Sequence, residues 1–211
     1  RRTLRRTARP GTPWWAPPSV IDARAAATIG SLSAIAIVVG YLGTLLTQTV
    51  TFVADEFDAG KTAQSATLAL VRVGVLATVV VTSLADRRGR RRLLLLAVSG
   101  GCVACALGAL APNLVGVGLS QLTVRTLVSA CTVLLTVIAA EEMPAGARAY
   151  GITVLGLSGA LGVGVCLFAL PLADVGVSAW RALYLLPLLG LLVVRRAARP
   201  LPQSPRDAVP P

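Results

Sequence analysis

Long stretches of the chain are almost free of charged side chains, and this pattern predicts the arrangement of the whole sequence. The stretches are residues 25–54, 62–85, 93–140, 149–173 and 182–194. Arg72 and Arg125 are the only charged residues inside them. A helix crosses a bilayer with about 20 apolar residues. The third stretch is about twice that length, and Ala111, Pro112 and Asn113 predict a tight turn that divides it into two helices. The pattern therefore predicts six transmembrane helices.

The predicted membrane domain covers residues 25–196, between a short segment at each end. Its helices are expected at residues 26–52, 64–84, 92–111, 114–140, 149–172 and 177–196. The leader, residues 1–24, is basic and rich in proline, and residues 197–211 form a proline-rich tail or the start of a central linker. The sixth helix reaches full length only with Trp180 and Arg181 at the membrane surface, where an aromatic ring and a long cationic side chain are stable. A re-entrant segment is the alternative.

Basic residues fall almost entirely on one side of this predicted membrane domain. That side carries Arg1, Arg2, Arg5, Arg6, Arg9, Arg24, Arg87, Arg88, Arg90, Arg91, Arg92, Arg148, Arg195, Arg196, Arg199 and Arg206. The other side has Lys61 and Arg181, accompanied by Asp55, Glu56, Asp58 and Asp174. Because basic loops remain in the cytoplasm, both termini are expected there, which agrees with an even number of helices.

Composition supports an integral membrane protein and argues against a nucleic-acid-binding one. Apolar residues make up 55% of the chain and charged residues 14%. The net charge of +11 is typical of nucleic-acid-binding proteins, but here the arginines alternate with membrane helices instead of forming one face.

Abundant Ala, Gly, Arg and Pro with a single lysine, Lys61, indicate a bacterium with GC-rich codons, so the expected location is the bacterial plasma membrane. The first apolar stretch is too long for a cleaved signal peptide, and the absence of an initiating methionine suggests a fragment.

The two intramembrane arginines are the candidate solute-binding residues, because a cation deep in a bilayer usually faces a cavity or a charged partner. Arg125 belongs to a polar stripe at helical spacing, formed by Gln121, Arg125, Ser129, Thr132 and Thr136. On the first helix, Tyr41, Thr44 and Gln48 share a face that could line the same cavity. Two cations with no nearby acid favour an anionic or polar solute. Alternatively, Arg72 and Arg125 each pair with an acid or with helix carbonyls from a part of the protein outside this chain.

No cofactor, metal site or enzymatic activity is expected. Cys102 and Cys105 form a Cys-x-x-Cys inside a predicted membrane helix with no further ligand nearby, so the four cysteines are read as small apolar residues. Residues 156–159 read Gly-Leu-Ser-Gly, as around the nucleophile of rhomboid proteases, but the chain contains no histidine to act as base. The glycines of the fifth helix are better explained by close helix packing.

One cytoplasmic loop carries a specific signature. Residues 84–93 read Leu-Ala-Asp-Arg-Arg-Gly-Arg-Arg-Arg-Leu, between two apolar stretches. The segment resembles the loop that joins the second and third helices of the major facilitator superfamily (MFS), with the matching residues Asp86, Arg87, Gly89, Arg90 and Arg91. Thr82 replaces the leading glycine of that pattern. The surroundings of Arg125 partly resemble the fourth-helix motif of the superfamily, and the segment from Glu141 to Arg148 resembles its next cytoplasmic loop.

This resemblance implies an all-α membrane protein that corresponds to the amino-terminal half of a twelve-helix transporter, built of two inverted three-helix repeats. It implies alternating access, a solute site between two halves, a coupled proton, and a conformational gate at Asp86 and its neighbouring arginines. The partner is then a missing carboxy-terminal half or a second copy of the chain. A transporter that exchanges drugs for protons is a variant of this hypothesis that differs only in its substrate. It is disfavoured because the predicted first helix carries no acidic residue. A non-transporting six-helix partner or regulatory protein is the alternative from another class.

Overall fold

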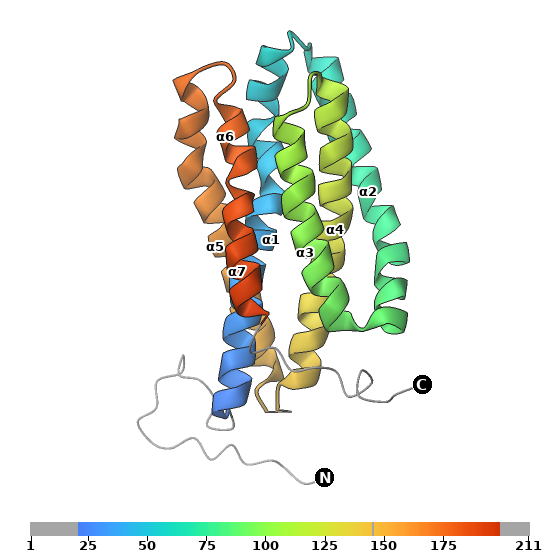
Figure 1. Cartoon of the computed structure of the whole chain (residues 1–211), viewed down its shortest axis with the longest axis vertical. Coiled ribbons are helices and arrows are strands. Elements are labelled where there is room, and N and C mark those ends of the chain that lie inside the picture. Colours follow the sequence, from blue (N-terminus) through green and yellow to red (C-terminus); the bar gives the residue numbers. More distant parts are fainter. Residues whose placement is uncertain (1–20, 145, 199–211) are drawn as a thin grey trace.

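The computed structural model describes residues 21–144 and 146–198, except for the side chains of residues 85–88. Within these ranges the chain is all-helical. The helices are α1 (Ala23–Glu56), α2 (Lys61–Arg88), α3 (Arg90–Ala109), α4 (Leu114–Glu142), α5 (Arg148–Ala169), a 3-10 helix η1 (Leu170–Val175), α6 (Trp180–Leu185) and α7 (Pro187–Ala197). They form one upright bundle with α2 and α5 at its two sides (Figure 1). The five segments Ala23–Glu56, Lys61–Leu84, Arg90–Ala109, Leu114–Glu142 and Arg148–Val175 are long and apolar enough to cross a membrane.

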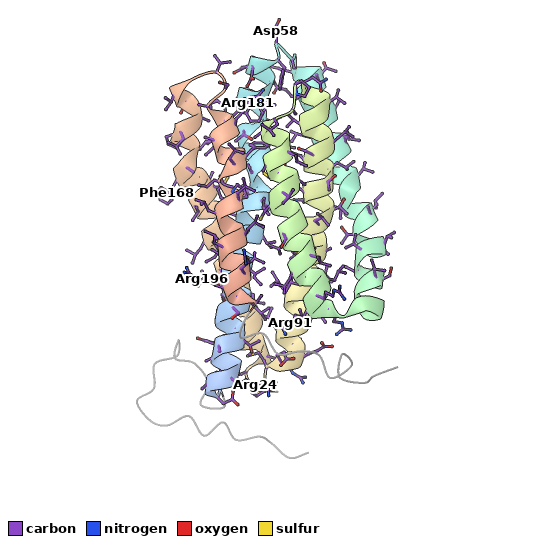
Figure 2. The ribbon with its side chains drawn as sticks, viewed as in Figure 1. Arg24, Asp58, Arg91, Phe168, Arg181 and Arg196 are labelled. Carbon is purple, nitrogen blue, oxygen red and sulfur yellow. The ribbon has the colours of Figure 1, made fainter. Side chains whose placement is uncertain are left out.

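The connections alternate between the two ends of the bundle. The start of α1, the α2–α3 and α4–α5 connections and the end of α7 lie at one end (Figure 1). Arg24, Arg91 and Arg196 are at this end, which we call the basic end, whereas Asp58 and Arg181 lie at the opposite end (Figure 2). The fold thus gathers most of the basic residues of the described helix ends at one end, as the sequence predicts. That the basic end faces the cytoplasm remains a prediction.

Local sequence signals explain where several helices begin. The side chain of Asp22 accepts a hydrogen bond from the backbone N–H of Ala25 (2.7 Å) and so caps α1. Asn113 caps α4 in the same way through the N–H of Gly116 (2.8 Å), directly after Pro112. Gly89 separates α2 from α3 with a φ of 88°, a conformation that glycine adopts without a steric penalty. The predicted division of residues 93–140 and the predicted α2–α3 turn are therefore found in the fold.

The last membrane segment differs from the prediction. A single helix over residues 177–196 was expected, whereas the structure has α6 and α7, divided at Leu186. Pro187 has no N–H to donate to the carbonyl of Leu183, one turn earlier. The hydroxyl of Tyr41 on α1 donates to this carbonyl instead (2.9 Å). A proline thus interrupts the helix, and a tyrosine from another helix satisfies the group that the proline leaves free.

Replacing Tyr41 by phenylalanine is expected to destabilise the bundle by about 1 kcal/mol, because the buried Leu183 carbonyl loses its partner. Thermal unfolding in detergent should show a melting temperature about 2–4 °C lower. Tyr150→Phe is the matched control, since the hydroxyl of Tyr150 has no hydrogen-bond partner among the described residues. Equal melting temperatures of the two variants would contradict this role of Tyr41.

The tightest contact in the bundle joins α1 to α5. A Cβ atom built on Gly40 would lie 2.1 Å from the carbonyl oxygen of Gly159, and one built on Gly162 would lie 2.0 Å from the carbonyl oxygen of Ile37. These distances leave no room for any side chain other than hydrogen. Of the glycines of the fifth helix, predicted to serve close packing, Gly162 does so, and Gly40 of α1 does so against the backbone of Gly159. This contact fixes α5 against α1 and thereby sets the width of the space beside them.

Candidate functional site

A cavity of about 420 Å³ lies between α1, α4 and α5. Its lining residues are Ala36, Val39, Gly40, Gly43, Thr44, Arg125, Val128, Thr132, Leu135, Thr136, Ile152, Leu155, Gly156, Gly159 and Val163. On α1 they lie around the middle of the helix, and on α4 and α5 they extend from near the middle toward the basic end. Arg125 is the only charged residue among them. The cavity is otherwise apolar, with three threonines, a composition typical of a site that holds a small ligand by one strong polar contact.

The guanidinium of Arg125 is only partly satisfied by the protein. One terminal nitrogen, NH1, donates to the carbonyl oxygen of Gly43 at 3.4 Å, which is a long hydrogen bond. The Nε atom is buried and has no hydrogen-bond partner among the described residues. A buried donor without a partner is unfavourable, and arginine presents its donors in a planar fork that suits carboxylate and phosphate oxygens. The arrangement can therefore bind an anionic group.

The other residues of the predicted stripe on α4 separate into two groups. Thr132 and Thr136 line the cavity with Arg125. Their hydroxyls donate to backbone carbonyls one turn earlier on the same helix, at 3.0 Å in both cases, so their oxygens remain free to accept. Gln121 is buried and points toward Cys105 on α3, with its Nε2 atom 3.8 Å from the sulfur. Ser129 is half-buried and is not part of the lining.

The predicted face of α1 also divides. Thr44 lines the cavity, whereas the hydroxyl of Tyr41 points toward α6 and Gln48 is outside the lining. Arg72 is exposed on α2, away from this cavity. Of the nine residues predicted to share one cavity, four line it, namely Arg125, Thr132 and Thr136 on α4 and Thr44 on α1. Positions separated by three or four residues still differ by up to 60° around a helix, so one end of a stripe can face a neighbouring helix.

Side chains of the signature loop join the helix ends at the basic end. Arg90 at the start of α3 forms an ion pair with Glu141 at the end of α4. Arg91 donates to the backbone carbonyl of Ala198 at the end of α7 (2.5 Å), where the helix dipole favours a cation. The side chains of Asp86 and Arg87 lie outside the described residues. The loop therefore connects α3 to both α4 and α7. The sequence does not predict these two contacts, although Glu141 and the arginines both belong to the loops that resemble those of the MFS.

A second polar cluster ties helices together at the opposite end. Glu56 at the end of α1 accepts from the indole N–H of Trp180 (2.5 Å) and forms an ion pair with Arg181 (2.7 Å). Arg181 also donates to the carbonyls of Ala109, the last residue of α3, and of Ala111 just after it (2.6 and 3.3 Å). Trp180 is fully buried against protein, and its depth at the membrane surface remains a prediction. The signal was present in the sequence, because Glu56 and Arg181 carry opposite charges on the same predicted side.

Among the described residues, no group of three or more His, Cys, Asp or Glu side chains could hold a metal ion. All four cysteines are buried and none forms a disulfide.

No protein-family model and no curated protein sequence matches the chain. Among solved structures, the chain is similar to a bacterial homolog of the human lysosomal transporter Spinster, captured in an inward-facing and unoccupied conformation. The TM-score is 0.74 at 17% sequence identity, and the match covers 90% of this chain and 46% of that one. The chain shares the fold of the matched part of that transporter. The chain spans about half the length of this structural relative. The MFS resemblance found in the sequence is thus confirmed at the level of the fold, and membrane insertion agrees with the apolar helices.

Proposed function

We propose that this chain is the amino-terminal half of an MFS secondary transporter that moves a small anionic or polar solute by alternating access. The observation that carries the proposal is the position of the Arg125 guanidinium in a cavity of a bundle with an MFS-like fold. Its Nε donor has no hydrogen-bond partner among the described residues. An anionic group on a solute would accept hydrogen bonds from Arg125, and Thr44 and Thr132 would supply further polar contacts. Two inverted three-helix repeats and both termini in the cytoplasm belong to the same proposal.

The position of the cavity supports an inward-facing arrangement. On α4 and α5 its lining begins near the middle of the helix and continues toward the basic end, the end we assign to the cytoplasm. The similar Spinster homolog is itself described as inward-facing and unoccupied. Arg125, close to the middle of Leu114–Glu142, would then bind the solute at the deep end of an inward-open path.

The low burial of two of the helices supports packing of this bundle against a second half of the transporter. Only 17% of the α2 span and 22% of the α5 span is buried, against 44–56% for the α1, α3 and α4 spans. A second set of helices packed on α2 and α5 would bury these faces. Such a partner would also close the open side of the cavity. Asp86, Arg87, Gly89, Arg90 and Arg91 would hold the cytoplasmic gate closed in the opposite conformation, and the ion pair between Arg90 and Glu141 would keep this loop attached to α4.

Transport is tested by counterflow with the protein purified from its native membranes and reconstituted in liposomes. Liposomes loaded with an unlabelled carboxylate, phosphate or neutral polar compound that is a substrate should accumulate the same labelled compound, whereas cations should not exchange. Asp86→Asn should slow this exchange while equilibrium binding of the solute is preserved, because the gate, and not the site, is altered. Glu142→Gln is the matched control at the same end of the bundle. Absence of exchange for every anionic and neutral polar compound, or equal loss of binding and exchange in Asp86→Asn, would contradict the proposal.

A further inference from the structure

Arg72 lies at the centre of the membrane-spanning part of α2 and is exposed. The span Lys61–Leu84 places it about 12 residues from each end, roughly 18 Å along the helix. No side chain or carbonyl among the described residues forms a hydrogen bond or ion pair with Arg72. Both membrane surfaces are too far for its guanidinium to reach water by extending along the helix. A cation in this position needs a protein partner or water at mid-membrane depth.

The packing of α2 against α4 prevents Arg72 from turning into the bundle. Gly74 lies on the opposite side of the helix, and a Cβ atom there would be 2.9 Å from the carbonyl oxygen of Leu122 on α4. Two hydrogen bonds reinforce this contact. Thr126 donates to the carbonyl of Gly74 (2.9 Å), and Thr78 donates to the carbonyl of Thr126 (3.4 Å). The orientation of α2 is therefore fixed, with Arg72 on its outer face.

The surroundings of Arg72 form an apolar surface that we call the α2 face. It consists of Arg72, Val73, Leu76, Val79 and Val80, and the four apolar side chains are 56–73% exposed. A lipid-facing helix would have the same apolar residues but no central cation. The α2 face is thus suited to a second transmembrane helix that offers a negative charge at the depth of Arg72.

A second copy of this chain does not fit the α2 face. The nine acidic residues of the sequence are Asp22, Asp55, Glu56, Asp58, Asp86, Glu141, Glu142, Asp174 and Asp207. Every one of them lies outside the middle of the five membrane-spanning segments. A symmetric contact through α2 would instead bring the two Arg72 side chains together, and like charges repel strongly where water is excluded.

We propose that the α2 face is covered by a transmembrane helix that carries an aspartate or glutamate at the depth of Arg72, and that this helix belongs to a polypeptide segment outside the present 211 residues. The carboxylate would accept two parallel hydrogen bonds from the guanidinium, which makes the pair strong and fixes the register of the two helices. This inference requires that α2 spans the membrane with the geometry described. It concerns the partner of the proposed transporter half, and it does not require that the protein transports a solute.

The test is photo-cross-linking in the native membrane. A benzophenone amino acid replaces Leu76, which is 73% exposed and lies one turn from Arg72. Leu107 on α3, 60% exposed, receives the same amino acid as the matched control. The Leu76 probe should yield a cross-linked peptide that contains an acidic residue within an apolar segment and does not belong to residues 1–211, whereas the Leu107 probe should react with lipid. Lipid adducts alone at Leu76, a peptide of this same chain, or a partner peptide without an acid would each overturn the proposal.

A charge exchange provides a second test with a separate readout. Arg72→Asp should abolish the cross-link at Leu76, because two acids would face each other across the contact. Replacing the identified acid by arginine in the same protein should restore the cross-link. Failure of the double variant to restore it, in protein that still inserts into the membrane, would overturn the ion pair. Solute counterflow is measured separately, so a failed cross-link and a failed transport assay remain distinguishable.

Discussion

Gly162→Ala is expected to destabilise the bundle strongly. The new Cβ atom would lie 2.0 Å from the carbonyl oxygen of Ile37 and 2.8 Å from its carbon. Both are backbone atoms of α1, so no side-chain rotation can relieve the clash. The helices would have to separate along their whole crossing, including the similar contact between Gly40 and Gly159. Overpacking of this kind typically destabilises a protein by about 3 kcal/mol.

The measurement is thermal unfolding together with the yield of monodisperse protein in detergent. A loss of about 3 kcal/mol corresponds to a melting temperature lowered by roughly 6–12 °C for a chain of this size. Gly164→Ala is the matched control, because it makes the same change on the same helix at a position with nothing within 4 Å of the new atom. Indistinguishable melting curves for the two variants would show that α1 and α5 do not pack as closely as described.

Arg125→Gln is expected to abolish most solute binding without unfolding the bundle. The guanidinium makes only one long hydrogen bond inside the protein, so its removal leaves few groups without a partner. A bound anion would lose a charged hydrogen-bond donor, which is worth about 1.5–3 kcal/mol. The dissociation constant should therefore rise roughly 10- to 150-fold. Arg125→Lys should lose less affinity, because it keeps the charge but lacks the planar fork.

Equilibrium binding of the labelled anion found by counterflow measures this effect. Thr123→Ala is the matched control, since Thr123 is exposed on α4 and lies outside the cavity. Its dissociation constant should equal that of the unaltered protein. Unchanged binding in Arg125→Gln, with a normal melting temperature, would remove Arg125 from the solute site.

Hydrophobic patterning predicted the membrane helices well because each one is a long apolar stretch with a clear end. Asn113 after Pro112 and Gly89 within the basic loop are local signals that act without help from distant residues. The sixth segment was predicted less well, because Pro187 divides it and the compensating hydroxyl of Tyr41 comes from a residue 142 positions away in the sequence. Long-range compensation of this kind has no local signature.

The site could be predicted only in part, for a related reason. Arg125 was identified because a lone arginine in an apolar stretch is rare, and Thr44 and Thr132 followed from helical spacing. The spacing could not show that Gln121 faces α3 or that Tyr41 faces α6, since helix rotation depends on packing. The apolar part of the cavity, including Gly43 and Val128, carries no sequence signal that distinguishes it from any other membrane-facing surface.

Water accessibility of the cavity from both sides of the membrane tests the central claim most directly. Thr132, exposed and part of the lining, is replaced by cysteine, and the native cysteines give little background because all four are buried. Alternating access predicts that a membrane-impermeant maleimide labels this position from either side. Leu107→Cys on α3, which is 60% exposed to the membrane, should remain unlabelled. Labelling of Thr132→Cys from one side only, in the presence and absence of solute, would contradict a transporter that opens its cavity alternately to the two sides.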